Sequence, residues 1–203
     1  QASAGVPHGE SGAPQELLVV GMGKLGGGEL NVSSDIDLVF VYPEEGETRP
    51  APGQEQVRRI SNHEYFSVVG RRLIGLLAQP TAEGFVFRVD MRLRPWGDPG
   101  PLAMSLDALE QYLVSQGREW ERYAWIKGRA LSGGESARRL LADTVRPFVF
   151  RKYLDYGAYG AMRDLHAQIR EEVARRELAD NVKLGAGGIR EIEFTAQVFQ
   201  LIR

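Results

Sequence analysis

The sequence predicts an α+β fold, in which a small mixed sheet with helices is followed by a helical extension. Residues 17–20 and 37–42 are short apolar runs bounded by glycine or proline, as expected for buried strands. Residues 85–94 alternate between apolar and charged side chains, which is typical of a strand with one exposed face. Past residue 134 the pattern is helical throughout. These observations favour one α/β unit over residues 15–131 and a helical extension over residues 132–203.

The first part of the chain is predicted to contain a tail, two strands and a helix. Residues 1–14 are rich in Ala, Gly, Ser and Pro and lack apolar periodicity, so we expect a flexible tail or linker there. The two strands that follow end at Gly21 and at Pro43, and a polar loop comes after the second. Apolar residues at helical spacing then predict a helix over residues 56–79, which Pro80 closes.

The remaining elements are one strand and several helices. The alternating strand ends at Pro95, and Ser105 has the position and chemistry of an N-cap for a helix that reaches residue 115. Further helices are predicted over residues 118–127, 136–150 and 159–177, and from residue 189 onward.

The composition excludes several classes of function. The 203 residues carry a formal net charge of −2, which gives no support for broad binding of nucleic acid. Cysteine is absent, so disulfides and thiolate metal sites are excluded, and the composition fits a reducing cytoplasm. The sequence has no signal peptide and no apolar run of the ~18 residues that a membrane helix needs. Because the chain begins with Gln1 and ends within an apolar-periodic stretch, we expect it to be a piece of a longer protein.

Three aspartates form the main candidate site. Asp35 and Asp37 open the second strand and point to the same face, with α-carbons roughly 6.6 Å apart. Carboxylates this close repel each other unless a cation lies between them, and a pair of divalent ions suits such a site. Asp90, on a neighbouring strand, would supply a third carboxylate for Mg²⁺ or Mn²⁺. The alternative is that the acidic residues at the start of the strand only keep the edge of the sheet hydrated.

A glycine-rich loop leads into the aspartates. Its backbone N–H groups and hydroxyls can cradle phosphate. The candidate residues for binding nucleotide or phosphate in this loop are Gly21, Gly23, Lys24, Ser33 and Ser34.

The same loop matches two other phosphate motifs poorly. The dinucleotide fingerprint requires a crossover helix after its third glycine, but the next strand follows Gly26 too soon for one of normal length. A Walker loop requires Ser or Thr after its lysine, and Lys24 is followed by Leu25.

Several cationic side chains are further candidates for binding phosphate. Arg92 and Arg94 share a strand face with Asp90, and the planar guanidinium suits phosphate oxygens; the alternative is a solvated face with internal ion pairs. Lys127 and Arg129 follow an aromatic-rich helix and could equally be surface residues.

A second glycine turn, near the C-terminal end, supplies two weaker candidates. Lys183 could bind phosphate, and Glu191 either takes part in the site or complements the dipole of the helix that it opens. His63 and His166 lack the partners of a metal site or a triad, and we interpret both as structural.

The run Gly-x-Gly-Lys-Leu-Gly-Gly-x-Glu-Leu-Asn-x-Ser-Ser-Asp-Ile-Asp-Leu at residues 21–38 resembles the signature of the glutamine synthetase adenylyltransferase/adenylyl-removing enzyme family. The resemblance continues through Val-Asp-Met-Arg-Leu-Arg-Pro at 89–95, Trp-Glu-Arg-Tyr-Ala at 120–124 and Val-Lys-Leu-Gly-Ala-Gly-Gly-Ile-Arg-Glu-Ile-Glu-Phe at 182–194. It implies a DNA polymerase beta-like nucleotidyltransferase domain.

The resemblance also implies an activity. Family enzymes carry two nucleotidyltransferase halves: one attaches AMP to a tyrosine of glutamine synthetase, and the other removes it by phosphorolysis, which yields ADP. Residues 26–31, 98–102 and 184–191 are more similar to the removing half. The implied ligands are an adenine nucleotide, inorganic phosphate and Mg²⁺ or Mn²⁺, and a PII signal protein controls the full-length enzyme. ATP-dependent adenylylation and a catalytically silent, nucleotide-binding regulatory module remain alternatives.

Overall fold

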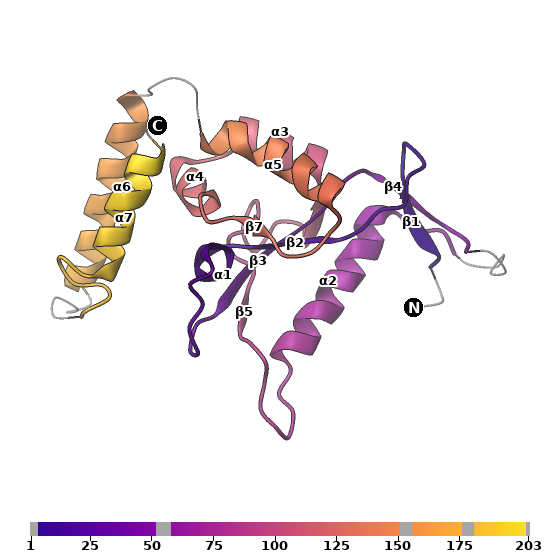
Figure 1. The fold of residues 1–203 in the computed structure, drawn as a ribbon, viewed down its shortest axis with the longest axis horizontal. Helices are drawn as coiled ribbons and strands as arrows, with labels where there is room; N and C mark the ends of the chain where they lie inside the picture. The colour runs from indigo at the N-terminus through magenta and orange to yellow at the C-terminus, as the bar shows by residue number, and fades with distance from the viewer. Residues whose placement is uncertain (1–3, 52–57, 151–155, 176–180, 202–203) are drawn as a thin grey trace. The chain divides into compact units, whose positions relative to one another are not determined.

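The structure is a computed structural model that describes residues 4–51, 58–150, 156–175 and 181–201 (Figure 1). It comprises two compact units. The first contains Gln1–Gln116 and Lys127–Val145, and the second contains Gly117–Ile126 and Arg146–Arg203.

A five-stranded mixed sheet organises the first unit. Its strands are β2 (Leu18–Gly21), β3 (Ile36–Tyr42), β5 (Val89–Asp90), β6 (Ala103–Ser105) and β7 (Arg129–Ala130). The strand β3 lies antiparallel to β2 and parallel to both β5 and β6, which pair with successive parts of it. On its other edge β2 pairs with β7. The predicted α+β fold with a small mixed sheet is confirmed.

The core forms around β3, because every residue from Leu38 to Tyr42 is apolar or aromatic and buried. The helix α2 (Asn62–Ala78) packs against this strand. The ring of Phe66 stacks on that of Tyr42 with centroids 4.9 Å apart. Burial of each such side chain stabilises the fold by about 1.5–3 kcal/mol. The core therefore fixes the position of β3, and so the position of Asp35 and Asp37 at the start of this strand.

The segment predicted to be a tail contains a strand. The strand β1 (Val6–Gly9) pairs antiparallel with β4 (Gly46–Arg49), which lies within the predicted polar loop. The buried Asn62 amide holds the pair in place, since it donates to the carbonyls of His8 (2.9 Å) and Glu44 (3.0 Å). Backbone pairing and one amide, rather than apolar periodicity, order this segment, so the tail prediction is wrong for residues 6–9.

The predicted strand over residues 85–94 is also wrong in length, because only β5 remains of it. Before β5, the N–H groups of Val86 and Phe87 donate to the carbonyl of Leu77 at the end of α2. After β5, the backbone N–H of Arg92 donates to the Asp90 carboxylate over 2.8 Å, and the chain turns. The alternating pattern was thus produced by a short strand between two turns.

Helices make up the rest of the described chain. They are α1 (Gly23–Gly27), α3 (Leu106–Ser115), α4 (Glu119–Trp125), α5 (Glu135–Val149), α6 (Tyr156–Arg175) and α7 (Ile189–Leu201). Ser105 caps α3 as predicted, with its hydroxyl accepting from the N–H of Ala108. The predicted helices past residue 134 are confirmed where the structure describes them. Residues 1–3, 56–57, 176–177 and 202–203 of the predicted elements lie outside the described residues.

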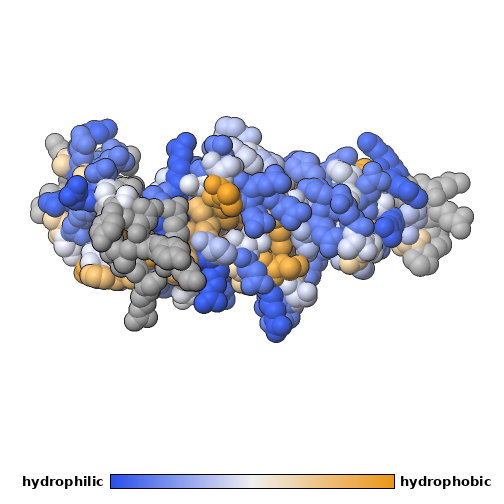
Figure 2. All heavy atoms as spheres, turned by 90° about the horizontal axis from the view of Figure 1, so that it is seen from above, coloured by the Kyte–Doolittle hydropathy of each residue, from blue (hydrophilic) through white to orange (hydrophobic). Residues whose placement is uncertain are grey.

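In the second unit, α6 and α7 lie side by side (Figure 1). Arg122 of α4 is buried and donates to the carbonyl of Val149 through Nε (3.3 Å) and Nη2 (3.1 Å). The ring of Tyr123 contacts that of Phe194 with centroids 5.3 Å apart. Within the described part of the chain, no helix has the length and apolar content that crossing a bilayer would require. Hydrophilic residues cover most of the face seen in Figure 2.

Candidate active site

The parallel pairing of β3 and β5 brings two of the three aspartates together. In its register Ile36 lies opposite Val89, and Asp37 lies opposite Asp90. Neighbouring strands are about 4.8 Å apart, so the two carboxylates share one face at close range. Asp35 immediately precedes β3. The sheet thus gathers the three candidate metal ligands at the start of its central strand.

Their charges interact unfavourably. Burial raises the pKa of Asp37 above its ordinary value of 3.8, and the negative charges of Asp90 and Asp35 raise it further, while Arg92 partly offsets them. A hydrogen bond from Arg92 instead lowers the pKa of Asp90. The negative charge of Asp37 is therefore less well compensated than that of Asp90.

Two exposed arginines hold the outer carboxylates. Arg88 Nε lies 2.5 Å from Asp35 Oδ1, and Arg92 Nη2 lies 2.5 Å from Asp90 Oδ2. With the carboxylates turned to these arginines, no three acidic or histidine side chains in the described residues are grouped as metal ligands. Exposed ion pairs contribute only about 0–1 kcal/mol, so a divalent cation could replace the guanidinium groups. Carboxylate oxygens are ligands that Mg²⁺ accepts, so the three aspartates could hold the ion after their side chains leave the arginines.

The glycine loop approaches the Asp37 side chain closely. Gly23 has a φ of +52°, and a Cβ atom there would lie 2.8 Å from Asp37 Oδ2. Only glycine combines this left-handed backbone with such an approach. The loop includes α1, which is five residues long, so a crossover helix of normal length is absent as the sequence indicated.

The loop residues are tied to one another. Lys24 Nζ donates to Ser34 Oγ over 3.3 Å, and the Ser34 hydroxyl donates to the Asn31 side chain. The carbonyl of Ser33 accepts from Arg88 Nη2 over 2.8 Å, and Gly21 ends β2. Arg88 therefore links the loop to Asp35. Sequence reasoning did not include Arg88 among the site residues, although the alternation at 88–94 placed it on the same face as Asp90.

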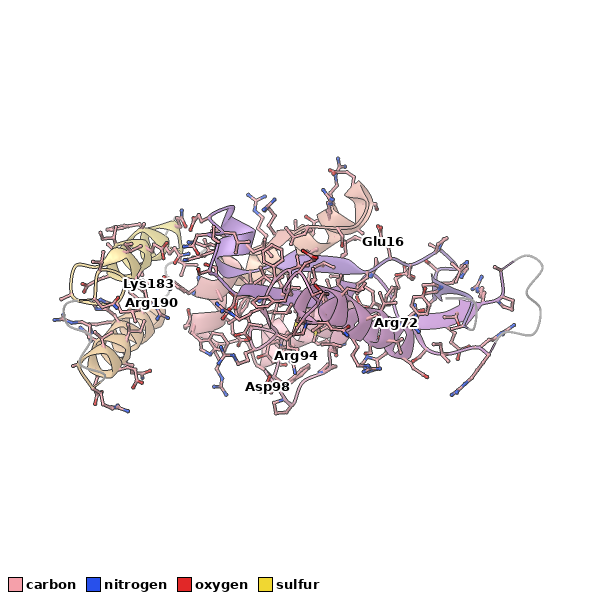
Figure 3. All side chains as sticks on the ribbon, turned by 90° about the horizontal axis from the view of Figure 1, so that it is seen from below. Glu16, Arg72, Arg94, Asp98, Lys183 and Arg190 are labelled. Atoms are coloured by element: carbon pink, nitrogen blue, oxygen red, sulfur yellow. The ribbon has the colours of Figure 1, made fainter. Side chains whose placement is uncertain are left out.

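The Arg94 side chain is bonded within the turn after β5, and its charge also helps to lower the pKa of Asp90. Its side chain donates to the carbonyls of Met91 (2.7 Å) and Asp98 (2.7 Å), and Nη1 lies 3.5 Å from the Asp98 carboxylate (Figure 3). These contacts brace the turn that follows β5.

Lys127 and Arg129 lie at the base of the glycine loop. Lys127 Nζ is paired with Glu29 Oε2 at 2.7 Å. Arg129 donates to the carbonyls of Gly26 (2.9 Å) and Leu25 (3.1 Å) at the end of α1. Both side chains thus help to hold the glycine loop in its conformation.

Lys183 and Glu191 belong to the second unit. The Lys183 side chain is exposed (Figure 3). Glu191 accepts from the N–H of Gly187 at 2.6 Å and is paired with His166 Nε2 at 2.9 Å, and these contacts lower its pKa. The carboxylate thus caps the turn before α7 and holds His166.

A mixed sheet that gathers acidic side chains beside a glycine-rich loop defines a nucleotidyltransferase-type domain. Residues 1–143 match the family model for glutamate-ammonia ligase adenylyltransferase. The chain belongs to this family. Residues 163–203 match a second model, GlnD PII-uridylyltransferase.

Curated relatives carry the name bifunctional glutamine synthetase adenylyltransferase/adenylyl-removing enzyme. The one from Chromobacterium violaceum is 71% identical over 98% of this chain, and the one from Nitrosomonas eutropha is 63% identical over 98%. The chain spans 21% of the length of each. The one from Ralstonia nicotianae is 60% identical, and the match covers 98% of this chain and 23% of that protein. The family resemblance seen in the sequence is confirmed.

Proposed function

We propose that this chain belongs to the adenylyl-removing half of a bifunctional enzyme, and that it removes AMP from the adenylylated tyrosine of glutamine synthetase. The reaction is a metal-dependent phosphorolysis that releases ADP and regulates nitrogen assimilation. The observation that carries the proposal is the register that sets Asp37 opposite Asp90, beside the close approach of Gly23. The names of the relatives include the same activity.

In the proposed reaction, an oxygen of inorganic phosphate attacks the phosphorus of the AMP group, and the bond to the tyrosyl oxygen breaks. The phenolate takes up a proton, and the products are ADP and unmodified tyrosine. Phosphate is already anionic at neutral pH, so a strong general base is not required. The leaving phenol has a pKa of about 10, so the reaction depends on positive charge near its oxygen and on in-line positioning.

Asp35, Asp37 and Asp90 are the proposed ligands of Mg²⁺ or Mn²⁺. Bound metal would neutralise charge on the phosphates and on the leaving phenolate. Arg88 and Arg92, whose side chains are 60% and 74% exposed, are proposed to bind phosphate oxygens once the carboxylates are otherwise engaged. Lys24 is a third candidate ligand for phosphate, because a phosphate oxygen can replace the Ser34 hydroxyl as the acceptor of its hydrogen bond.

The choice of the removing half rests on sequence similarity at residues 26–31, 98–102 and 184–191. The relatives are named for both activities, so ATP-dependent adenylylation is the second candidate. A PII signal protein is the proposed regulator of the full-length enzyme.

Two reaction mixtures test the proposal. The chain is incubated with adenylylated glutamine synthetase, phosphate and Mg²⁺, and separately with unmodified glutamine synthetase, ATP and Mg²⁺. ADP in the first mixture alone supports removal. Adenylylation in the second mixture alone would assign the chain to the opposite half. Nucleotide binding without turnover in either would favour a regulatory module.

A further inference from the structure

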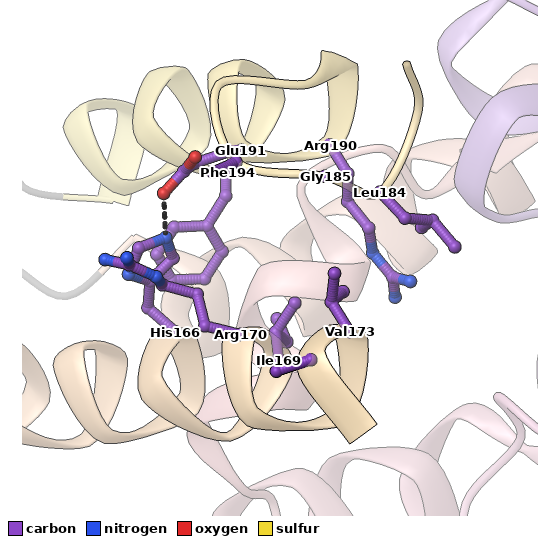
Figure 4. A pocket seen from close by; sticks show the side chains of 11 residues that line it. His166, Ile169, Arg170, Val173, Leu184, Gly185, Arg190, Glu191 and Phe194 are labelled. Carbon is purple, nitrogen blue, oxygen red and sulfur yellow. Dashed lines mark ion pairs between the residues drawn. The ribbon is translucent and has the colours of Figure 1, made fainter. Parts of the chain in front are cut away.

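The second unit contains a pocket that the proposed reaction does not use. It lies between α6, α7 and the turn that precedes α7, and it has a volume of about 190 Å³ (Figure 4). Its lining combines an apolar wall with charged side chains. Because all of these residues lie within one compact unit, the pocket can be analysed by itself.

The apolar wall can receive a ring or a short aliphatic group. Ile169 and Val173 line it from α6, Leu184 from the turn, and Phe194 from α7. The Phe194 ring stacks on His166 with centroids 5.2 Å apart, so it is fixed in place. An apolar cavity of about 150 Å³ is enough to bind benzene. The pocket therefore has room for one ring and a small head group.

The charged side chains favour an anion. Arg170 extends from α6 and Arg190 from α7, and both line the pocket (Figure 4). Within the described parts of the chain neither guanidinium forms a close ion pair or a hydrogen bond, although the positive charge of Arg170 helps to lower the pKa of Glu191. The carboxylate that lines the pocket, Glu191, is already engaged by Gly187 and His166. The lining thus carries two guanidinium groups against one hydrogen-bonded carboxylate, and this excess of positive charge suits a phosphate or carboxylate.

We propose that this pocket binds a small organic anion. A phosphate or carboxylate head group binds Arg190, whose guanidinium lies at the opposite end of the pocket from that of Arg170 (Figure 4), and an aromatic or aliphatic body packs against Ile169, Val173 and Phe194. The volume fits a small molecule rather than a folded protein segment. The pocket also lies within residues 163–203, the part of the chain that matches a second family of nucleotidyltransferases with a different named protein target.

Methyl NMR of the 203-residue chain tests this proposal, with signals from Ile169, Val173 and Leu184 as local reporters. The probes are phenyl phosphate and benzoate, which present the two head groups on the same ring. Inorganic phosphate and phenol supply the head and the body alone. We expect saturable shifts with at least one of the two complete probes, and the tighter one identifies the head group. The separate head and body should bind at least about tenfold more weakly, because both parts of the pocket contribute.

Paired variants give the controls. The double variant Arg170→Gln/Arg190→Gln should weaken binding at least about tenfold, because charge-assisted contacts are lost. Arg175→Gln, an exposed α6 position outside the pocket, should leave binding within about twofold of the original chain. Ala174→Phe should fill the pocket and abolish the shifts. The proposal is overturned if neither complete probe saturates, or if binding survives in the double variant. These reporters do not lie near the aspartates in sequence or within their unit, so the result is independent of the proposed reaction.

Discussion

At the residue scale, Asp37 is held where its charge is unfavourable. A carboxyl group whose pKa is raised by folding binds its proton more tightly in the folded state than in the unfolded state. Its contribution to stability therefore falls as pH rises from 3.8 through the raised folded pKa. At neutral pH the ionised side chain costs stability, which is typical of a functional group rather than a structural one.

The substitution Asp37→Asn tests this cost. We expect turnover to fall at least about a thousandfold, because a proposed metal ligand is lost. The melting temperature at pH 7 should rise, since the repulsion from Asp35 and Asp90 disappears. Asp143→Asn, at an exposed position of α5, should change neither quantity. Near-normal activity in the Asp37 variant would remove this residue from the site.

Gly23 offers a second test at the same scale. Gly23→Ala places a methyl group against the Asp37 carboxylate and adds the left-handed backbone penalty of about 1–2 kcal/mol. Gly28→Ala carries a comparable penalty, with φ of +73°, but its methyl group meets nothing within 4 Å. Both variants should lose stability in urea unfolding, Gly23→Ala at least as much as Gly28→Ala, and only the first should lose most of its activity. Equal activities would show that the close approach has no functional consequence.

At the element scale, the connection between α4 and α5 depends on Arg122. Its side chain is only 3% exposed, and Nη1 is paired with Glu119 Oε2 at 2.7 Å in addition to its bonds to Val149. Removing the guanidinium leaves a carboxylate and a carbonyl without these partners.

Arg122→Ala should therefore destabilise the second unit by about 3–5 kcal/mol. Hydrogen exchange of α4 amides measures the effect locally. Arg139→Ala removes an exposed pair with Glu135 on α5, and should cost no more than about 0.5 kcal/mol. A similarly small cost at Arg122 would contradict the structural role assigned to its buried bonds.

The elements also show which features the sequence could predict. Helix α3 could be predicted because Ser105 is a favourable N-cap residue and apolar residues follow it at helical spacing. The strands β6 and β7 were missed because they have three and two residues, too few to show a period. The strand β1 was missed because backbone pairing, rather than an apolar face, holds it.

The residues of the candidate site could be predicted from the sequence, but the contacts between them could not. Adjacent aspartates and glycines could be recognised along the chain, but the register that sets Asp37 opposite Asp90 depends on the folded sheet. The same limit applies to Arg94. Its alternation with Asp90 suggested a phosphate ligand, whereas the turn after β5 directs it to backbone carbonyls.

At the scale of the whole molecule, metal binding should stabilise the folded chain. An ion that binds only the folded state at a hundred times its Kd adds about 2.7 kcal/mol to the free energy of unfolding. We expect Mg²⁺ to raise the melting temperature by several degrees and EDTA to reverse the change. The Asp37→Asn variant should show a much smaller shift. An equal shift in both chains would place the stabilising ion elsewhere.

The most direct measurement is a crystal structure of this chain with Mn²⁺, in which anomalous scattering locates the ion. We predict Mn²⁺ bound by Asp35, Asp37 and Asp90, with Arg88 and Arg92 released from their carboxylate partners. Mn²⁺ bound only at other residues, with both arginine–aspartate pairs intact at saturating Mn²⁺, would contradict the assignment of the active site.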